Sequence, residues 1–398
     1  MGKLVIRNIG TIASGDIDAP LLQGDTIVIV DGRIAQVGRE GDCDTSGAGT
    51  IIDAQGTTVI PGLIDSHVHP VFGDYTPRQR TVDFIDSALH GGITTMISAG
   101  EVHTPGRPKD VVGIKALAIA AYKSFSNFRP SGVKVHAGAP ILEPGMVEED
   151  FAEMAKAGVK LIGEIGLGGV RTPEEAAPMV RWAKKFGMKV TIHTGGPSLP
   201  GSHALDADMV IAIDPDVVGH VNGGTTSVSL SDVEKLVNRT DLTLEVVHCG
   251  NPKTALHTLN CARQIDGLKR IIIGNDAPSG TGVIPLGILR VISLLSSLSP
   301  LSPEEAIALA TGNTARVYSL NTSMIRVGYE ADLVILDAPV GSVGKDALSA
   351  LKAGDIPGIS MVLIDGEIRI GRSRNTAPAS KMAKIVKSDQ LSLVSSGH

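Results

Sequence analysis

Residues 61–69 read Pro-Gly-Leu-Ile-Asp-Ser-His-Val-His, an apolar run that ends in two histidines two positions apart. Alternate side chains of a β-strand point to the same face, so His67 and His69 would lie side by side at the end of a strand. Two imidazoles placed in this way can bind one metal ion. The pair alone is weak evidence, because paired histidines also occur on strands that bind nothing.

Seven further β-branched runs follow, separated by stretches with the composition of helices. Together with the run that contains His67, the predicted strands are 58–69, 94–99, 133–138, 160–165, 189–194, 217–221, 244–248 and 270–276. Alternating strands and helices indicate a parallel sheet, and eight strands in about 260 residues match a (β/α)8 barrel. A doubly wound open sheet is the alternative, but the first strand is not followed by a Gly-rich phosphate-binding sequence.

Both ends of the chain are predicted to contribute to a second, smaller β structure. Asp31-Gly32 and Asp365-Gly366 each separate two apolar runs and favour tight antiparallel hairpins. Neither end has enough strands to bury a sheet face alone, so we expect the two ends to pair. The predicted fold class is α/β, a (β/α)8 TIM barrel inserted in a small β-sandwich built from both chain ends. The predicted domains are the sandwich at 1–60 plus 321–375, the barrel at 61–320, and a C-terminal tail or arm at 376–398.

The composition excludes several classes of protein. Hydrophobic residues make up 42% of the chain and charged residues 20%, which indicates a folded protein rather than a disordered one. The formal net charge of −6 argues against nucleic-acid binding. Cys43, Cys249 and Cys261 show no Cys-x-x-Cys spacing, which favours a reducing, cytoplasmic compartment. We expect neither a signal peptide nor a membrane span, since no apolar segment reaches about 20 residues.

Four further potential ligands stand at the ends of predicted strands. Glu164, His193, His220 and Asp276 end or follow the fourth, fifth, sixth and eighth strands. Counted from His69, the successive intervals of 95, 29, 27 and 56 residues correspond to three, one, one and two βα units. In a barrel these strand ends meet at the C-terminal mouth, where active sites lie. The set therefore predicts one metal site, although a single strand histidine is more often a hydrogen-bonded core residue.

The order of these residues resembles the amidohydrolase superfamily. The resemblance extends to Gly62-Leu63-Ile64-Asp65 before the histidine pair, to Asn313-Thr314-Ala315-Arg316 in a late helix, and to Gly328-Tyr329-Glu330-Ala331-Asp332-Leu333-Val334 on the returning strand. It implies hydrolysis of a cyclic amide at a binuclear metal centre. Within the superfamily, the nearest resemblance is to the enzyme of nicotinate fermentation that opens the ring of 6-oxo-1,4,5,6-tetrahydronicotinate. Many members have a carboxylated lysine on strand 4, whereas this chain has Glu164.

The resemblance also implies a role for each ligand. One cation would be held by His67, His69 and Asp276, the other by His193 and His220, with Glu164 and a hydroxide between them. We expect two divalent metal ions per chain, with zinc as the first choice and iron(II) as an alternative in one site. Asp276 would also be catalytic, taking a proton from the attacking water and delivering it to the leaving nitrogen.

Substrate selection is predicted to lie in the loops that follow the strands. The candidate substrate-binding residues are Tyr75, Arg78, His103, His136 and His248. Each could instead be a solvated surface group or a residue that supports the barrel. Aromatic residues make up only 3% of the chain, so a small anionic cyclic amide suits it better than a large planar substrate. The expected partners are this small molecule and further copies of the chain in a dimer or tetramer, with no nucleic acid or membrane.

Two other functions stay open at this point. A mononuclear aminohydrolase would displace ammonia from a small ring, and its signature would be an inert residue on strand 4, where Glu164 stands. A catalytically silent barrel that serves as an assembly subunit would be marked by the loss of ligands, because fold alone does not imply activity. None of the six predicted ligands is missing.

Overall fold

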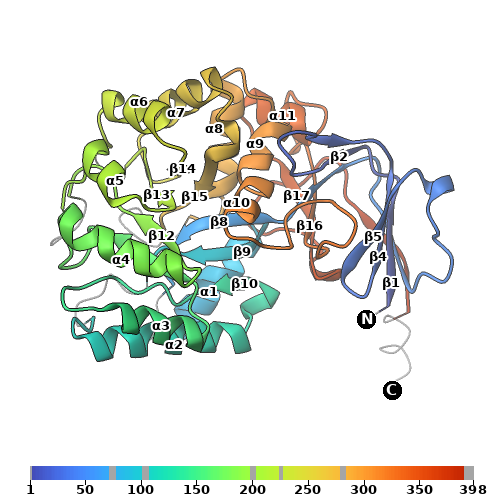
Figure 1. Cartoon of the computed structure of the whole chain (residues 1–398). Coiled ribbons are helices and arrows are strands. Elements are labelled where there is room, and N and C mark those ends of the chain that lie inside the picture. Colours follow the sequence, from blue (N-terminus) through green and yellow to red (C-terminus); the bar gives the residue numbers. More distant parts are fainter. Residues whose placement is uncertain are drawn as a thin grey trace. The chain divides into compact units, whose positions relative to one another are not determined.

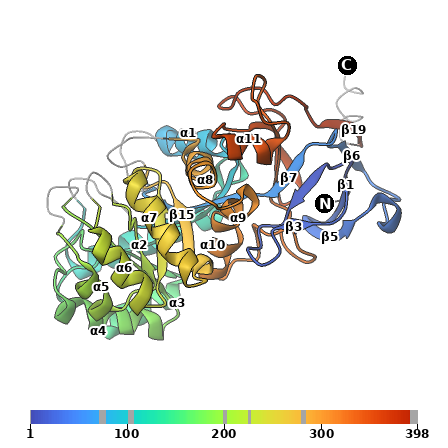
Figure 2. The ribbon, with the colours of Figure 1, turned by 90° about the horizontal axis from the view of Figure 1, so that it is seen from above.

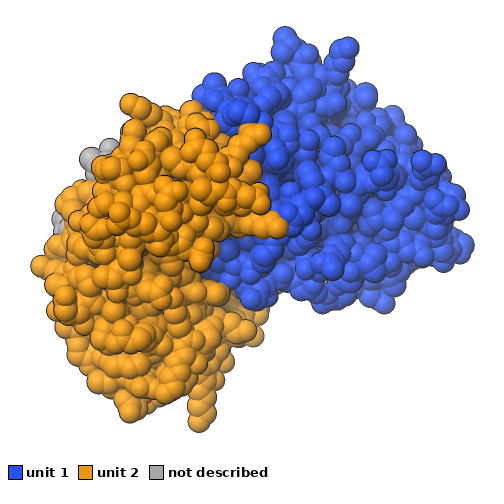
Figure 3. Space-filling model, turned by 45° about the horizontal axis from the view of Figure 1, so that its top comes forward, with its two compact units in different colours: residues 1–63, 87–94, 292–398 blue, residues 64–86, 95–291 orange. Residues whose placement is uncertain are grey.

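The computed structural model describes residues 2–70, 78–100, 107–197, 203–223, 227–277 and 284–389. The chain divides into two compact units, which Figure 3 colours separately. The first unit contains residues 1–63, 87–94 and 292–398, and the second contains residues 64–86 and 95–291. In the described part of the chain, no helix has the length and apolar character needed to cross a membrane.

The first unit is built on two sheets to which both ends of the chain contribute (Figure 2). One sheet has the order β19-β6-β1-β4-β5, and the other has the order β18-β17-β16-β7-β2-β3. The strands are β1 Lys3–Arg7, β2 Thr11–Ala13, β3 Leu21–Leu22, β4 Thr26–Val30, β5 Arg33–Gly38, β6 Thr50–Asp53, β7 Thr58–Pro61, β16 Leu333–Asp337, β17 Gly358–Ile364, β18 Glu367–Ile370 and β19 Lys384–Ser388.

The two predicted hairpins are confirmed. Asp31 and Gly32 join β4 to β5 with φ angles of 48° and 80°, and Asp365 and Gly366 join β17 to β18 with φ angles of 51° and 71°. Two consecutive residues with positive φ match the twist of antiparallel strands. Within the stretch 376–398, β19 pairs antiparallel with β6.

Apolar side chains from both sheets share one core. Ile6 and Ile29 of the five-stranded sheet and Val59, Leu333 and Met361 of the six-stranded sheet all belong to it. Within β1 the alternate side chain, Val5, faces a second cluster with Val28 and Ala48, as the two-residue period of a strand requires. The larger core therefore needs strands from both ends of the chain, whereas the smaller cluster around Val5 is formed by N-terminal residues alone.

Helices from the later part of the chain lie wholly or partly in the first unit. They are α8 Gly287–Leu298, α9 Pro303–Leu309, α10 Gly312–Val317 and α11 Ala347–Ala353. Helix α9 begins as the sequence predicts: the Ser302 side chain accepts a hydrogen bond from the Glu305 amide, and the Glu305 carboxylate accepts one from the Ser302 amide. This reciprocal cap satisfies two amides that the first helical turn leaves unpaired.

Among its described residues, the second unit contains eight parallel strands surrounded by helices (Figure 1). The strands form two sheets with the orders β10-β9-β8 and β11-β12-β13-β14-β15. Their bounds are β8 Leu63–Val68, β9 Ile93–Ser98, β10 Lys134–His136, β11 Leu161–Ile165, β12 Lys189–Ile192, β13 Val217–Val218, β14 Thr243–Val247 and β15 Ile271–Gly274. The helices are α1 Arg78–Leu89, α2 Val111–Asn127, α3 Glu148–Ala157, α4 Pro173–Lys185, α5 Ala207–Ile213, α6 Leu230–Arg239 and α7 Pro252–Gln264. Three short 3-10 turns lie at Glu40–Asp42, Pro130–Gly132 and Leu268–Arg270.

Hydrogen bonds join the two parallel sheets on both sides. On one side the Gly163 amide of β11 donates to the Pro140 carbonyl, in the segment that follows the edge strand β10, at 2.9 Å, and the Glu164 amide donates at 2.7 Å to the Ala99 carbonyl, which follows the middle strand β9. On the other, the Asp276 amide donates to the His67 carbonyl at 2.9 Å, and Val68 forms a parallel bridge with Ala277. The C-terminal ends of β8, β9, β11 and β15 are thereby held together, and the predicted ligands stand at these ends.

The predicted first strand, 58–69, is wrong in one respect, because it is two strands. Residues Thr58–Pro61 form β7 of the six-stranded sheet, and Leu63–Val68 form β8. The division falls at Gly62, where a Cβ atom would lie 2.1 Å from the Thr94 Oγ1 atom and 2.8 Å from the Thr94 Cβ atom. Only glycine allows the chain to approach Thr94 so closely, and β8 starts at the next residue.

We expect Gly62→Ala to lower the free energy of unfolding by about 1–3 kcal/mol, because overpacking of a buried site costs this much. Urea denaturation followed by circular dichroism measures the change. The matched control is Gly371→Ala, since a Cβ atom at Gly371 meets nothing within 4 Å. Equal stability of the two variants would contradict the packing argument.

Candidate metal centre

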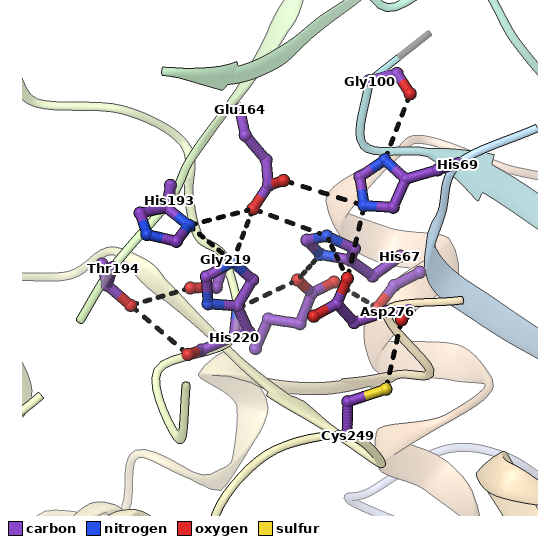
Figure 4. Close-up of polar contacts among 12 residues, drawn as sticks. His67, His69, Gly100, Glu164, His193, Thr194, Gly219, His220, Cys249 and Asp276 are labelled. Carbon is purple, nitrogen blue, oxygen red and sulfur yellow. Dashed lines mark hydrogen bonds and ion pairs between the residues drawn. The ribbon is translucent and has the colours of Figure 1, made fainter. Parts of the chain in front are cut away.

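The six predicted ligands lie together at one end of the parallel strands (Figure 4). His67 is in β8 and His69 follows it, Glu164 is in β11, His193 follows β12, His220 lies two residues after β13, and Asp276 lies two residues after β15. All six are buried. Side chains separated by more than 200 residues in the sequence therefore share one site.

The carboxylate of Glu164 lies between the two pairs of histidines. Its Oε1 atom is 2.6 Å from His220 Nε2, 3.5 Å from His67 Nε2 and 4.0 Å from His193 Nδ1. Its Oε2 atom is 3.8 Å from His69 Nε2. Imidazole nitrogens therefore face both oxygens of this carboxylate. A carboxylate that bridges two cations would have the same position.

Two overlapping groups of potential metal ligands result, and Glu164 belongs to both. In the group of His67, His69 and Glu164, and in the group of Glu164, His193 and His220, one ligand atom per residue lies within 4.8 Å of the others. Asp276 Oδ1 is 3.3 Å from His69 Nε2 and 3.8 Å from His67 Nε2, which places it beside the first group. Imidazole and carboxylate donors in this number suit zinc or iron(II).

One atom of the site provides an independent test of fit. The Nε2 atom of His67 is buried and has no hydrogen bond with the described residues, although its Nδ1 atom bonds to Glu245. A buried nitrogen without a hydrogen bond is costly, and although the charges of Glu245 and Glu164 raise the pKa of His67, a cation can take the place of the proton on this nitrogen. This nitrogen faces the oxygens of Glu164 and Asp276, so the residues present fit a bound cation.

The carboxylates of the site are ionised. Burial acts against the charge of Glu164, but the neighbouring charges of His67 and His220 hold the pKa of this carboxyl well below its usual range. The pKa of Asp276 is likewise lowered despite burial, chiefly by its hydrogen bond with His69 and by the charge of His67. Burial and the charge of His220 lower the pKa of His193 to about 4, so this imidazole is neutral and its nitrogens can bind a metal.

Two of the predicted ligands have strained backbones. His220 has a φ angle of 32° and Asp276 has a φ angle of 58°, in the left-handed region that residues other than glycine rarely adopt. The Thr194 hydroxyl donates to the carbonyl of Gly219 at 2.9 Å and holds the chain beside His220. Such strain persists where the surrounding contacts enforce it, and it clusters at functional sites.

A buried carboxylate that the sequence did not reveal lies beside the predicted ligands. Glu245 lies in β14 and is fully buried, and it accepts hydrogen bonds from Ser66 and His67. Asp65 was also missed as a site residue: it is buried, it accepts hydrogen bonds from Asn275, and burial raises its pKa to about 7. The signal for Glu245 was a glutamate inside the apolar run Thr243–Val247, where an unpaired charge would be costly.

The candidate substrate-binding residues lie in different places. Tyr75 and His103 lie outside the described residues, and Arg78 begins helix α1 but its side chain is not among those described. His136 ends β10, and burial with the charges of Lys134 and Lys160 lowers its pKa to about 4. His248 follows β14, and burial lowers its pKa.

A third group of potential metal ligands lies on the outer helices. Glu234 of α6 and His257 and Cys261 of α7 hold ligand atoms within 4.8 Å of one another. His257 Nε2 is 3.2 Å from Glu234 Oε1, and the Glu234 side chain is 54% exposed. Hydrogen bonding between surface side chains explains these contacts without a metal. A variant that lacks one of these three side chains separates metal bound here from metal bound at Glu164.

Comparison with known proteins identifies relatives over the whole chain. Enamidase of Eubacterium barkeri is 58% identical over 386 residues, which cover 97% of this chain and all of that protein. The crystal structure of enamidase, described as a new member of the amidohydrolase superfamily, superimposes with a TM-score of 0.93 over 97% of this chain and all of that one. Imidazolonepropionase of Mycolicibacterium smegmatis is 26% identical over 92% of this chain and 98% of that protein.

The resemblance inferred from the sequence is confirmed by these relatives and by the amidohydrolase family pattern, which matches residues 58–369. That match includes all six predicted ligands. The chain belongs to the amidohydrolase family.

Proposed function

We propose that this protein is an enamidase-like hydrolase that opens the ring of 6-oxo-1,4,5,6-tetrahydronicotinate, or of a closely related cyclic amide, at its C–N bond. The observation that carries the proposal is the 58% identity with enamidase over 97% of this chain, at a TM-score of 0.93. The six buried ligand residues, Glu164 and the five around it, support it independently, because their donor set suits hydrolysis at a metal centre.

We further propose that the eight parallel strands of the second unit close into a (β/α)8 barrel. The hydrogen bonds from Gly163 to Pro140, after β10, and from Asp276 to His67, in β8, support closure at the two edges. The shared core of the two sheets supports a β-sandwich in the first unit. In this interpretation the six ligands stand at the C-terminal mouth of the barrel, where active sites of this fold lie.

The residues present would hold two divalent cations. We assign His67, His69 and Asp276 to one, His193 and His220 to the other, and Glu164 to both, with zinc preferred and iron(II) an alternative in one site. Such cations lower the pKa of water and polarise a carbonyl oxygen. The negative charge of Glu164 would serve both cation sites. His220 and His67, which lie close to Glu164 Oε1, hold the carboxylate in this position.

Asp276 is the residue best placed to move a proton. Its carboxylate lies beside His67 and His69, and the lowered pKa keeps it ionised and able to accept a proton from water. The same group then donates this proton to the ring nitrogen as the C–N bond breaks. Water is thereby divided between the two ends of the opened ring: the carbonyl carbon gains the hydroxyl group and becomes a carboxylic acid, which loses its proton to solvent, and the nitrogen gains the other proton.

Several finer points stay predictions from the sequence. They are the anionic character of the substrate, the dimeric or tetrameric assembly, the cytoplasmic location and the roles of Tyr75, Arg78, His103, His136 and His248. A mononuclear aminohydrolase is the alternative activity. The carboxylate of Glu164 between two pairs of histidines favours the binuclear amide hydrolase.

The proposed reaction is tested by incubating the purified protein with 6-oxo-1,4,5,6-tetrahydronicotinate and following the product by NMR and mass spectrometry. We expect the ring to open with a new carboxylate. The nitrogen is left on an enamine, which water converts to an aldehyde and ammonia, so ammonia release alone does not identify the reaction. Ring-closed products, or activity only on rings that carry an exocyclic amine, would favour the aminohydrolase.

Metal analysis by plasma mass spectrometry is expected to give about two zinc or iron atoms per chain. Dialysis against a chelator should abolish the activity, and zinc or iron(II) should restore it. Glu164→Gln is expected to hold at most one metal, because a neutral amide with a single acceptor oxygen bridges two cations poorly. Glu143→Gln, at another buried glutamate, is the matched control and should hold both metals. Cys261→Ser should also hold both, which separates the centre from the group on α6 and α7.

Asp276→Asn is expected to lower kcat by about 10²–10⁴, the usual contribution of a general acid–base group. Metal content is measured on the same sample, because Asp276 is also assigned as a ligand. Asp346→Asn is a suitable control: Asp346 caps α11, and asparagine caps a helix equally well. An Asp276→Asn protein with its metals and full activity would remove the assigned role.

A further inference from the structure

Glu245 is a buried carboxylate that belongs to neither group of metal ligands yet contacts residues of both. It is fully buried in β14. Its Oε1 atom accepts a hydrogen bond from the Ser66 hydroxyl at 2.5 Å. Its Oε2 atom lies 2.5 Å from His67 Nδ1 and accepts a hydrogen bond from the His220 amide at 3.3 Å.

A carboxylate at full burial requires compensation. Removing an ionised carboxylate from water costs several kcal/mol, and only well-placed donors or cations offset that cost. Here three donors surround the two oxygens, and two of them belong to assigned metal ligands, His67 and His220. Because burying this carboxylate in an apolar strand costs free energy, we infer that Glu245 has a function at the neighbouring site.

We propose that Glu245 is the positioning residue of the metal centre, orienting His67 for one cation and the His220 backbone for the other. The inference rests on the proposed function, since it assumes that His67 and His220 hold metals.

The contact with His67 determines which ring nitrogen carries the proton. A carboxylate accepts a hydrogen bond, so Nδ1 of His67 must carry the hydrogen that points to Glu245. The other nitrogen, Nε2, is then the one that can exchange its proton for a cation, and it is this atom that faces Glu164 at 3.5 Å and Asp276 at 3.8 Å. Metal-binding histidines usually donate their second N–H group to such a partner, which sets the tautomer and makes the bound nitrogen a stronger donor.

The contact with His220 acts on the backbone instead of the ring. His220 holds a φ angle of 32°, and its amide points to Glu245 Oε2 while its ring Nε2 lies 2.6 Å from Glu164 Oε1. Turning the backbone out of this conformation would break the bond to Glu245 and move the ring away from Glu164. One carboxylate oxygen therefore constrains a ligand of each proposed cation.

The test is the zinc affinity of metal-free Glu245→Gln, measured by competition with a chromophoric chelator. Glutamine has the same shape but no charge, so we expect an affinity 10–100-fold weaker than that of the parent protein. Glu143→Gln, at a buried glutamate that contacts Arg107 and the Gly169 amide, should keep the parental affinity. All proteins carry Cys261→Ser, which removes the outer group of ligands from the titration.

A second readout separates positioning from a merely structural role. In zinc-loaded protein labelled with ¹⁵N-histidine, the Nδ1 proton of His67 should give a strongly downfield signal because it is bonded to a carboxylate. This signal should move upfield or disappear in Glu245→Gln. If Glu245→Gln does not fold, Glu245→Asp serves as the second variant. It keeps the negative charge but shortens the side chain by one methylene group, and we expect a smaller loss of zinc affinity and a smaller shift of the His67 signal.

The outcomes distinguish this inference from the proposed function. If the parent protein binds about two zinc ions and Glu245→Gln or Glu245→Asp binds them with equal affinity and an unchanged His67 signal, Glu245 has no positioning role. If the parent protein itself binds no zinc, the metal centre fails, and the inference fails with it. Weakened binding with a shifted His67 signal supports both.

Discussion

The structure of the second unit depends on the burial of three carboxylates, those of Glu164, Glu245 and Asp276, among four imidazoles. Each carboxylate would be costly alone, so each must find partners, and the partners come from strands far apart in the sequence. The backbone accommodates this crowding. At Gly274 a Cβ atom would lie 2.6 Å from the His67 Cβ atom, and at Gly219 one would lie 2.8 Å from the Ile192 carbonyl oxygen. Small residues thus let the strands approach closely enough for the charged groups to meet.

The same constraint accounts for the strain at the site. His220 and Asp276 hold positive φ angles, and each is held by contacts outside its own strand. The Asp276 amide donates to the His67 carbonyl, while the His220 amide donates to Glu245. A ligand held in a strained conformation loses little further freedom when a cation binds, because its orientation is set by the folded chain. The site is in this sense organised by the protein before any cation is bound.

Much of the candidate site could be predicted because each βα unit of a parallel sheet occupies a similar length of sequence and returns the chain to the same end of the strands. The intervals between His69, Glu164, His193, His220 and Asp276 matched whole βα units, and the structure brings these residues together. The division of the predicted first strand at Gly62 could not be predicted, since it depends on the distance to Thr94. The role of Glu245 was also hidden: its partners Ser66 and His67 lie 179 and 178 residues away, and nothing local distinguishes their contact.

By itself the sequence determined the features that depend on near neighbours. The Asp-Gly hairpins, the cap of α9 and the common face of His67 and His69 follow from backbone preferences and from the two-residue period of a strand. Only the tertiary structure decided which nitrogen of His67 faces the proposed metals, how Glu164 lies between two pairs of histidines, and which buried carboxylate orients them. These depend on distances between side chains of different strands, and such distances exist only once the strands have assembled around a common centre.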